Sequence, residues 1–354
     1  MTFAFRLRQA LLIARLELGR AFFSKRAFWV YGLALFPLLI FVGHGLDATW
    51  KRQRWAERIT TREKLDTVAE GQTLEEVRQR LGKPIRQGDW EDREENRKHN
   101  WLSYYDGRRR MDLDFNNGLL THIRSEPLVN FEEDRTIFAT VFQYFYLPLA
   151  IFFGCLGIFM NLFRGEMLDK TLHYWLLAPA RRETLLAGKY LAGVAAAVII
   201  FGVGTVVCFY SVMWYQNGAE VQAYWAGPGL SHLGWYVAAS TLACVGYGSV
   251  FVAAGLLVRN PIIPAVILLL WESINNFLPA ALQKLSVLYY VQSLCPVPPA
   301  EIDNDTPVLL KMLLSPAEPA PAAGAVLGVL AVTALVLWIA SRTIRRTEIN
   351  YGTD

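Results

Sequence analysis

Apolar residues of this chain gather into long blocks, separated by polar segments of unequal length and charge. A helix that crosses a membrane needs about 20 mostly apolar residues. The blocks that meet this requirement are residues 27–44, 136–163, 187–214, 232–258, 262–283 and 321–341. The first lacks a small-residue cleavage site after it, so we expect a retained helix and not a signal peptide. The pattern predicts an α-helical polytopic membrane protein with six transmembrane helices and both termini on one side.

Basic residues beside these blocks predict the orientation, because loops rich in Lys and Arg face the cytoplasm. Such residues are concentrated in residues 1–26, in the loop 164–186 and in the tail 342–354. The loop 215–231 has neither Lys nor Arg, and the proline-rich stretch 284–320 has two lysines and no arginine. We therefore expect the first three segments inside the cell and the last two outside.

Two further segments extend this bundle. Residues 1–26 mix large apolar side chains with six basic residues and Glu17, which is typical of a helix lying in the membrane interface. Basic residues beside a span also serve simply to fix orientation or to meet anionic lipid. Residues 45–135 are long enough for a small domain. They are expected outside, because long domains cross the membrane largely regardless of their charge.

Local patterns in residues 45–135 predict a helix followed by strands. Thr73 and Glu76 form a capping-box pattern, and Gly82 ends the helix that they begin. Apolar and polar residues alternate over residues 111–115, as in a half-buried strand, after an aromatic-rich stretch at residues 101–105. The dipeptide Asn117-Gly118 predicts a hairpin turn. The polar run 89–99 alternates in charge sign and indicates a solvated loop or a strand edge.

This order of helix, turn and strand signals resembles the SmpA/BamE-like lipoprotein domain over about residues 68–125. The matching positions are Gly71, Thr73, Val77, Leu81, Gly82, Pro84, Trp101, Tyr104, Phe115 and Gly118. The resemblance implies a small α+β extracytoplasmic insert domain, with helices packed on an antiparallel sheet, of a kind usually found as a protein-binding unit in the bacterial envelope. This copy lacks the lipidated cysteine, so the flanking spans would hold it at the membrane.

The loop after the second apolar block carries the pattern of a short amphipathic helix. Its apolar residues share one helical face: Leu168, Leu172, Trp175 and Leu176. Asp169, Lys170 and His173 take the opposite face. Pro179 ends this helix, and a second helix then carries Arg181 and Arg182 toward the third block. An ordinary basic inner loop would account for the basic residues as well.

The same loop resembles that of the type-2 family of ABC transporter permeases. The shared features are an acidic residue, a Thr-Leu pair, a Pro-x-Arg and a Gly-Lys: Glu166, Thr171 with Leu172, Pro179 with Arg181 and Arg182, and Gly188 with Lys189. In that family the loop holds a coupling helix that contacts a separate ATPase subunit, which the resemblance implies here for residues 166–178. The expected ATPase-coupling residues are Glu166, Leu168, Lys170, Thr171, Leu172, Trp175, Leu176, Pro179, Arg181 and Arg182.

The resemblance also implies partners and a location. Two permease copies, most simply a homodimer, would each engage one ABC ATPase subunit in a bacterial cytoplasmic (inner) membrane. The complex would work as an exporter, with ATP and magnesium on the partner ATPase and no cofactor in this chain. Small residues allow close helix contacts within one copy or across a dimer: Gly188, Gly193, Gly202 and Gly204.

Glu272 is the carboxylate that lies well inside an apolar block, and ionisable groups there are candidates for function. Asn275 and Asn276 make its surroundings polar. One hypothesis places these three residues on the substrate path or at a dimer interface. The other is that the span breaks near Pro279 into an outward helical hairpin, where Glu272 meets interfacial water.

Several function classes lack their motifs. The sequence has no GxxxxGK[ST], no HExxH and no GxSxG, so we expect no enzyme activity in this chain. Cys155, Cys208, Cys244 and Cys295 form no CxxC pattern, and a net charge of +4 is too small to indicate nucleic-acid binding. The alternative to a transporter is a non-transporting envelope sensor or assembly anchor whose insert binds an external protein. No residue identifies the transported substrate.

Overall fold

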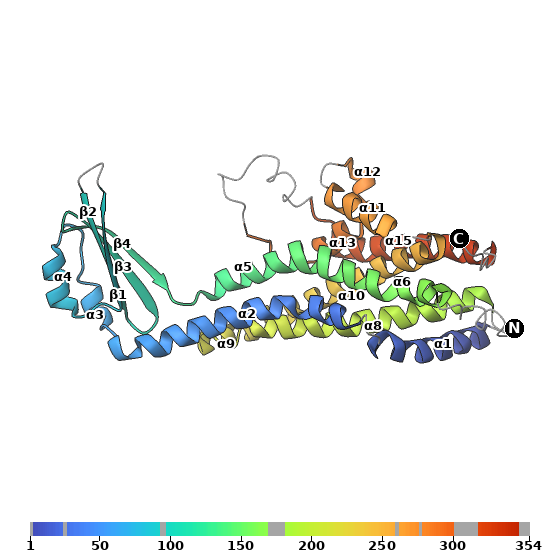
Figure 1. Cartoon of the computed structure of the whole chain (residues 1–354), viewed down its shortest axis with the longest axis horizontal. Coiled ribbons are helices and arrows are strands. Elements are labelled where there is room, and N and C mark those ends of the chain that lie inside the picture. Colours follow the sequence, from blue (N-terminus) through green and yellow to red (C-terminus); the bar gives the residue numbers. More distant parts are fainter. Residues whose placement is uncertain are drawn as a thin grey trace. The chain divides into compact units, whose positions relative to one another are not determined.

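The computed structural model of the protein describes residues 3–23, 27–92, 97–168, 181–258, 262–275, 278–300 and 318–346, and the structural statements below concern these residues. They form mainly helices and one antiparallel sheet (Figure 1). The chain divides into two compact units. A helical unit contains Met1–Leu39, Arg135–Tyr210 and Gln222–Asp354, and an insert unit contains Ile40–Asp134 and Ser211–Val221.

Most of the described residues lie in helices. In the order of the chain, the larger ones are α1 (Phe3–Phe23), α2 (Ala27–Trp55), α5 (Phe131–Val141), η2 (Phe142–Ile151), α6 (Phe152–Leu168), α8 (Arg182–Ser211), α9 (Gly218–Ala226), α10 (Gly229–Leu257), α11 (Ile262–Ser273), α12 (Ala280–Gln283), α13 (Val287–Ser293) and α15 (Ala322–Arg346). The stretches long and apolar enough to cross a membrane are Phe28–Arg58, Phe131–Met160, Arg182–Ser211, Gly229–Leu257 and Ala322–Arg345. These five candidates overlap five of the six predicted blocks.

The sixth predicted span, residues 262–283, does not form one helix. Its apolar part is α11, which has 12 residues and ends at Ser273. A helix of that length is about 18 Å long, whereas the hydrocarbon core of a membrane is about 30 Å thick. Pro279 precedes the four-residue α12, and α13 follows after Ser286. The structure therefore supports five candidate spans and a broken segment, and six continuous spans are not confirmed.

Within the helical unit, α10 packs against α6, α13 and α15. Small residues allow this close approach: a Cβ added to Gly248 of α10 would lie 2.4 Å from the Phe159 ring of α6. The same ring would meet a Cβ on Gly193 of α8 at 2.5 Å. Phe159 is fully buried. One phenylalanine thus fills the space that glycines leave open on two neighbouring helices.

The second predicted span is helical throughout but changes its hydrogen-bond spacing. The segment η2 is a π-helix and contains Pro148. A proline removes one backbone donor and clashes with the preceding turn of an α-helix, which favours a wider local winding. Tyr146, on the same segment, is buried and donates a hydrogen bond of 2.8 Å to the carbonyl oxygen of Phe201. This bond joins the widened segment to α8.

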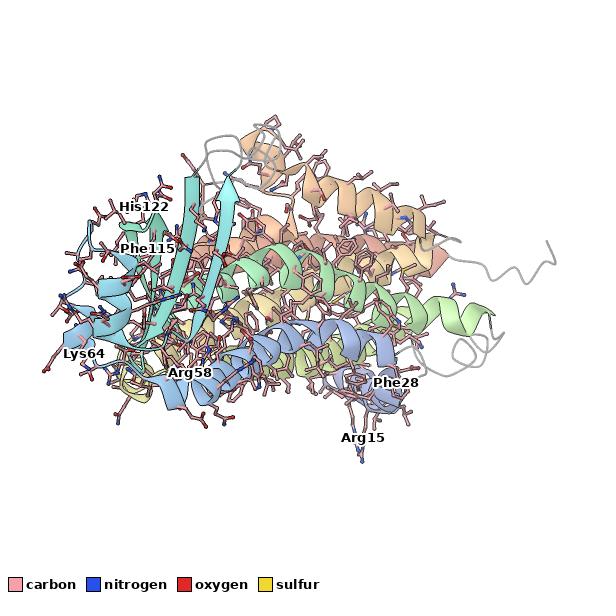
Figure 2. The ribbon with its side chains drawn as sticks, turned by 60° about the vertical axis from the view of Figure 1, so that its left-hand side comes forward. Arg15, Phe28, Arg58, Lys64, Phe115 and His122 are labelled. Atoms are coloured by element: carbon pink, nitrogen blue, oxygen red, sulfur yellow. The ribbon has the colours of Figure 1, made fainter. Side chains whose placement is uncertain are left out.

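The insert unit contains a four-stranded antiparallel sheet in the order β1-β2-β3-β4. The strands are β1 (Arg86–Asp92), β2 (Arg97–Tyr105), β3 (Arg109–Asn116) and β4 (Leu119–Pro127), and they are preceded by α3 (Arg62–Leu65) and α4 (Leu74–Leu81). Leu65 of α3 and Val77 of α4 share one buried cluster with Leu113 and Phe115 of β3. The unit is therefore a small α+β module with its own core; Figure 2 labels Phe115 within it.

The predicted caps and turn of the insert are confirmed. Thr73 accepts a hydrogen bond from the Glu76 amide while the Glu76 carboxylate accepts one from the Thr73 amide, which is a capping box. Gly82 follows α4 with a φ of 80°, and Asn117 and Gly118 have φ of 52° and 81° in the turn between β3 and β4. These conformations explain the choice of glycine and asparagine, because other residues rarely adopt positive φ.

The polar run 89–99 is mainly strand and not loop. Residues 89–92 belong to β1 and residues 97–99 to β2, and Trp90 pairs with His99 across the two strands. β1 is an edge strand, so both its faces carry polar residues and the alternation that marks a half-buried strand is missing. The other edge, β4, is joined at its start to the residues before α4, through hydrogen bonds between Gly71 and Leu120 and between Leu120 and Gln72.

Candidate functional site

The predicted coupling loop lies between α6 and α8. Glu166 and Leu168 are in the last turn of α6, Arg181 directly precedes α8, and Arg182 is its first residue. The remaining predicted coupling residues fall outside the described part of the chain: Lys170, Thr171, Leu172, Trp175, Leu176 and Pro179. The coupling helix therefore stays a prediction. The structure describes the two helix ends that flank it, the end of α6 and the beginning of α8.

The first turn of α8 is bound to the last turn of α15. The Arg182 guanidinium donates to the carbonyl oxygens of Ile344 and Arg345, at 3.2 and 3.4 Å. Arg345 in turn lies 2.5 Å from the Glu183 carboxylate. The last carbonyls of a helix have no partner within it and carry partial negative charge. Arg182 satisfies two of them, so a sequence-predicted coupling residue also fixes the position of α15.

About two helical turns further along α8, a buried ion pair links three helices. The Lys189 ammonium lies 2.9 Å from the Glu17 carboxylate of α1 and donates a second bond, of 2.9 Å, to the Leu162 carbonyl of α6. The two charged side chains are 0% and 4% exposed. Buried charges are stable only when they are paired and hydrogen-bonded. The pair therefore holds α1, α6 and α8 in one arrangement.

Gly188 makes this approach of α1 to α8 possible. A Cβ at position 188 would lie 2.7 Å from the Ile13 Cβ and 2.8 Å from the Ala10 carbonyl oxygen. Ala10, Ile13 and Glu17 are buried and recur at helical spacing, so they form the inner face of α1. The other face is exposed, with Leu16 at 68% and Arg15 pointing away from the neighbouring helices (Figure 2). This is the two-faced pattern expected of an interfacial helix.

The sequence identified one half of this ion pair. Lys189 belongs to the Gly-Lys feature of the loop, whereas the pattern of residues 1–26 predicts an interfacial helix that contains Glu17 and gives no partner for it. One signal could have singled it out, because Glu17 is the single acidic residue among residues 1–26. An acid among many bases on an apolar helix face needs a partner when buried, and a lysine next to a helix-packing glycine is a suitable one.

Glu272 is buried at the end of α11, where it caps α13. Its carboxylate accepts a hydrogen bond from the Ser286 hydroxyl and from the backbone amides of Val287 and Leu288, at 3.1 and 3.3 Å. Ser286 is the N-cap of α13 and accepts from the Tyr289 amide at 3.0 Å. The first amides of a helix have no internal partner and favour a negative group. Glu272 therefore binds the beginning of the segment that follows the break.

This geometry bears on both hypotheses for Glu272. The segment does break around Pro279, as the second hypothesis expects, but Glu272 is 5% exposed and hydrogen-bonded to protein groups. Asn275 is also buried, and its side-chain oxygen has no hydrogen-bond partner among the described residues. Asn276 lies outside them. A place on a substrate path or at a dimer interface stays a prediction.

Three of the four glycines singled out for close packing face neighbouring helices of the same copy. Besides Gly188, an added Cβ at Gly193 would meet Phe159, and one at Gly204 would lie 2.5 Å from the Tyr146 hydroxyl oxygen. A Cβ at Gly202 has open space around it. The first three positions thus serve contacts within the protomer.

Among the described residues, no group of three or more His, Cys, Asp or Glu side chains could hold a metal ion.

The comparison with protein families matches residues 11–270, which is more than half of the chain, to a family described as "ABC-2 family transporter protein". The matched region includes α8, the Glu17–Lys189 pair and the insert unit. None of the curated proteins matches the chain.

Proposed function

The chain belongs to the ABC-2 family of transporter proteins, and we propose that it is the permease of an exporter driven by a separate ATPase subunit. Family membership makes it a transmembrane subunit of an ABC transporter. The direction of transport, the coupling helix and the pairing of two permeases belong to the proposal. So do the location in a bacterial inner membrane and the outward-facing insert.

One observation supports the coupling part of this proposal best. The helix that follows the loop 164–186, α8, is bound to α1 and α6 through Lys189 and to α15 through Arg182. A displacement of α8 that keeps these bonds would move all four helices together. Helices connected in this way could transmit a movement of the loop, caused by a conformational change of the ATPase, to the rest of the bundle.

The basic residues around this loop support the proposed orientation. Arg181 and Arg182 at the start of α8, and Arg342 and Arg345 near the end of α15, are expected on the cytoplasmic side by the positive-inside rule. The hydrogen bonds between Arg182 and the end of α15 are consistent with both helix ends lying on one side. An ATPase that hydrolyses cytoplasmic ATP would then approach this end of the bundle.

The test is site-specific photo-crosslinking in membranes of cells that make the full chain. A photoreactive residue at Trp175, in the predicted coupling helix, should capture a protein that carries the GxxxxGK[ST] motif. The matched control places it at Trp225 of α9, another tryptophan, in the loop expected outside. Capture of an ATPase from position 225 and not from position 175 would contradict the proposal. Capture of no ATPase from position 175 would do so as well.

A further inference from the structure

A cavity of about 500 Å³ lies within the insert unit, where the end of α2 faces the beginning of β1. Four cationic side chains and two indole rings line it: Lys51, Arg54, Arg58, Arg86, Trp50 and Trp55. Glu57 is the one acidic residue of the lining. The cavity therefore combines a strong excess of positive charge with aromatic surface; Figure 2 labels Arg58, the last residue of the 3₁₀ helix η1 (Ala56–Arg58) that follows α2.

Helical spacing brings most of these residues to one side. Trp50 and Arg54 are four residues apart on α2, with Lys51 and Trp55 beside them, and Arg58 follows on the 3₁₀ helix η1. The helix then ends, and the backbone becomes extended at Ile59. Across the cavity, the amide of Ile85 donates to the Ser103 carbonyl at 2.9 Å and so fixes the position of Arg86 beside β2.

The floor of the cavity is rigid. Trp55, Ile85 and Tyr105 form a buried cluster, and the rings of Trp55 and Tyr105 meet edge to face at 5.5 Å. Trp55 is 6% exposed, whereas Trp50 at the rim is 55% exposed. Trp55 thus belongs to the core of the insert, whereas Trp50 is exposed at the rim.

Of the four cationic side chains that line the cavity, Lys51 has an acidic partner: it forms an ion pair with Asp47 at 2.5 Å. Two of the arginines contact aromatic rings instead. Arg54 lies over the Trp50 ring at 4.9 Å and Arg86 over the Trp101 ring at 5.7 Å. In the described parts of the chain, no carboxylate lies within ion-pair distance of Arg54, Arg58 or Arg86. Several guanidinium groups around one cavity are suited to bind an anion, and their planar fork matches the oxygens of a phosphate.

The position of the cavity along α2 indicates where such an anion comes from. The predicted span ends at residue 44, and Trp50 follows six residues later on the same helix, or about 9 Å further along its axis. The polar headgroup layer is about 5–7 Å thick on each side of the membrane, so Trp50 begins just beyond it, at a border where tryptophan is enriched. Side chains of a helix lean toward its N-terminus, which here directs Lys51 and Arg54 back toward the headgroups.

We propose that this cavity binds a phosphate-bearing anionic group, with a lipid headgroup of the outer leaflet as the source that its depth favours. A soluble phosphate ester has the same chemistry and is distinguished by experiment. The binding site itself follows from contacts within the insert unit, and only the choice of a lipid depends on the proposed topology. The test below needs no ATPase, so its outcome is independent of the crosslinking test of the proposed function.

The experiment measures ligand binding to the purified full chain in two arms. In one, the protein is reconstituted in zwitterionic nanodiscs, and binding of added phosphatidylglycerol is followed by native mass spectrometry. In the other, glycerol phosphate is titrated by calorimetry. The test variant combines Arg54→Gln with Arg58→Gln, and the control combines Arg62→Gln with Lys64→Gln on α3, which removes the same charge outside the cavity.

We expect wild type and the α3 control to bind alike and the cavity variant to bind at least about tenfold more weakly, the effect of losing one or two charge-assisted hydrogen bonds. Binding in the lipid arm alone identifies a headgroup, and binding in the calorimetric arm identifies a soluble ester. The inference is overturned if wild type binds neither probe or if the α3 control loses as much affinity as the cavity variant. A variant that combines Arg54→Lys with Arg58→Lys keeps the charge and should bind more tightly than the Gln variant, which shows that lost charge and not misfolding explains the loss of affinity.

Discussion

The Lys189 ammonium lies 2.9 Å from the Glu17 carboxylate, and both side chains are buried between α1, α6 and α8. Removal of one partner leaves an unpaired buried charge, which costs about 3–5 kcal/mol, whereas replacement of both by apolar residues is often tolerated. We therefore expect Lys189→Met and Glu17→Leu each to destabilise the protein strongly, and the double variant to be more stable than either single variant. Thermal unfolding in detergent measures how far each of the three variants differs from wild type in stability. Additive losses would show that the two residues are not coupled.

Gly188 and Gly202 form a matched pair on α8. Gly188→Ala forces a methyl group against Ile13 and the Ala10 carbonyl, so we expect a loss of about 1–3 kcal/mol. Gly202→Ala meets open space and should be neutral or gain up to about 1 kcal/mol from helix propensity. The midpoint of thermal unfolding compares the two. Equal effects would mean that α1 does not pack on α8 as described.

Glu272 and Ser286 should act together as the cap of α13. Glu272→Ala leaves the hydroxyl and two amides without their acceptor, whereas Glu272→Gln keeps one acceptor oxygen. We expect the alanine variant to lower the unfolding midpoint more than the glutamine variant, and Ser286→Ala to cost about 1 kcal/mol. Transport measured at equal membrane abundance separates the roles. If Glu272→Gln abolishes transport without changing stability, Glu272 acts on the substrate path and not as a cap.

Tyr104 makes the insert sensitive to alkaline pH. Burial raises the pKa of Tyr104 from 10.0 to about 12. Between these values the unfolded state loses its phenolic proton while the folded state retains it, so this group's contribution is complete below pH 10 and is lost as the pH rises toward 12. We expect the unfolding midpoint to fall over this range, and to fall less in Tyr104→Phe. The variant also loses the bond from the Tyr104 hydroxyl to the Gly82 carbonyl, so the slope with pH is compared and not the midpoint at neutral pH.

The sequence predicted the features that depend on neighbours along the chain. The capping box of Thr73 and Glu76, the positive φ of Gly82 and the turn at Asn117 require only short-range chemistry, and the structure has all three. Of the six spans predicted from the long apolar blocks, five overlap the candidate spans of the structure, and the block 262–283 does not form one helix. The resemblance to type-2 ABC permeases, based on residues 164–189, agrees with the family match over residues 11–270.

Features that depend on distant parts of the chain were predicted only as one of two alternatives or not at all. A break near Pro279 was one of two hypotheses for the span 262–283, but the hydrogen bonds that Glu272 accepts from Ser286 and Val287 were not predicted, because hydropathy does not detect a carboxylate that caps a later helix. The partner of Lys189 is 172 residues away. β1 lies at the sheet edge and has no apolar face, so its sequence left a solvated loop and a strand edge as alternatives, and the structure has the second. In each case a contact, and not a local pattern, decides the structure.

The two borders of the sheet are protected against further strand pairing in different ways. β1 carries Arg86, Asp89, Glu91 and Asp92, and charged side chains on an edge strand discourage another chain from adding to it. The start of β4 is already bonded to residues 71 and 72, and its end is Pro127, which has no amide to donate. Both edges of the insert sheet are thereby guarded against aggregation by strand addition.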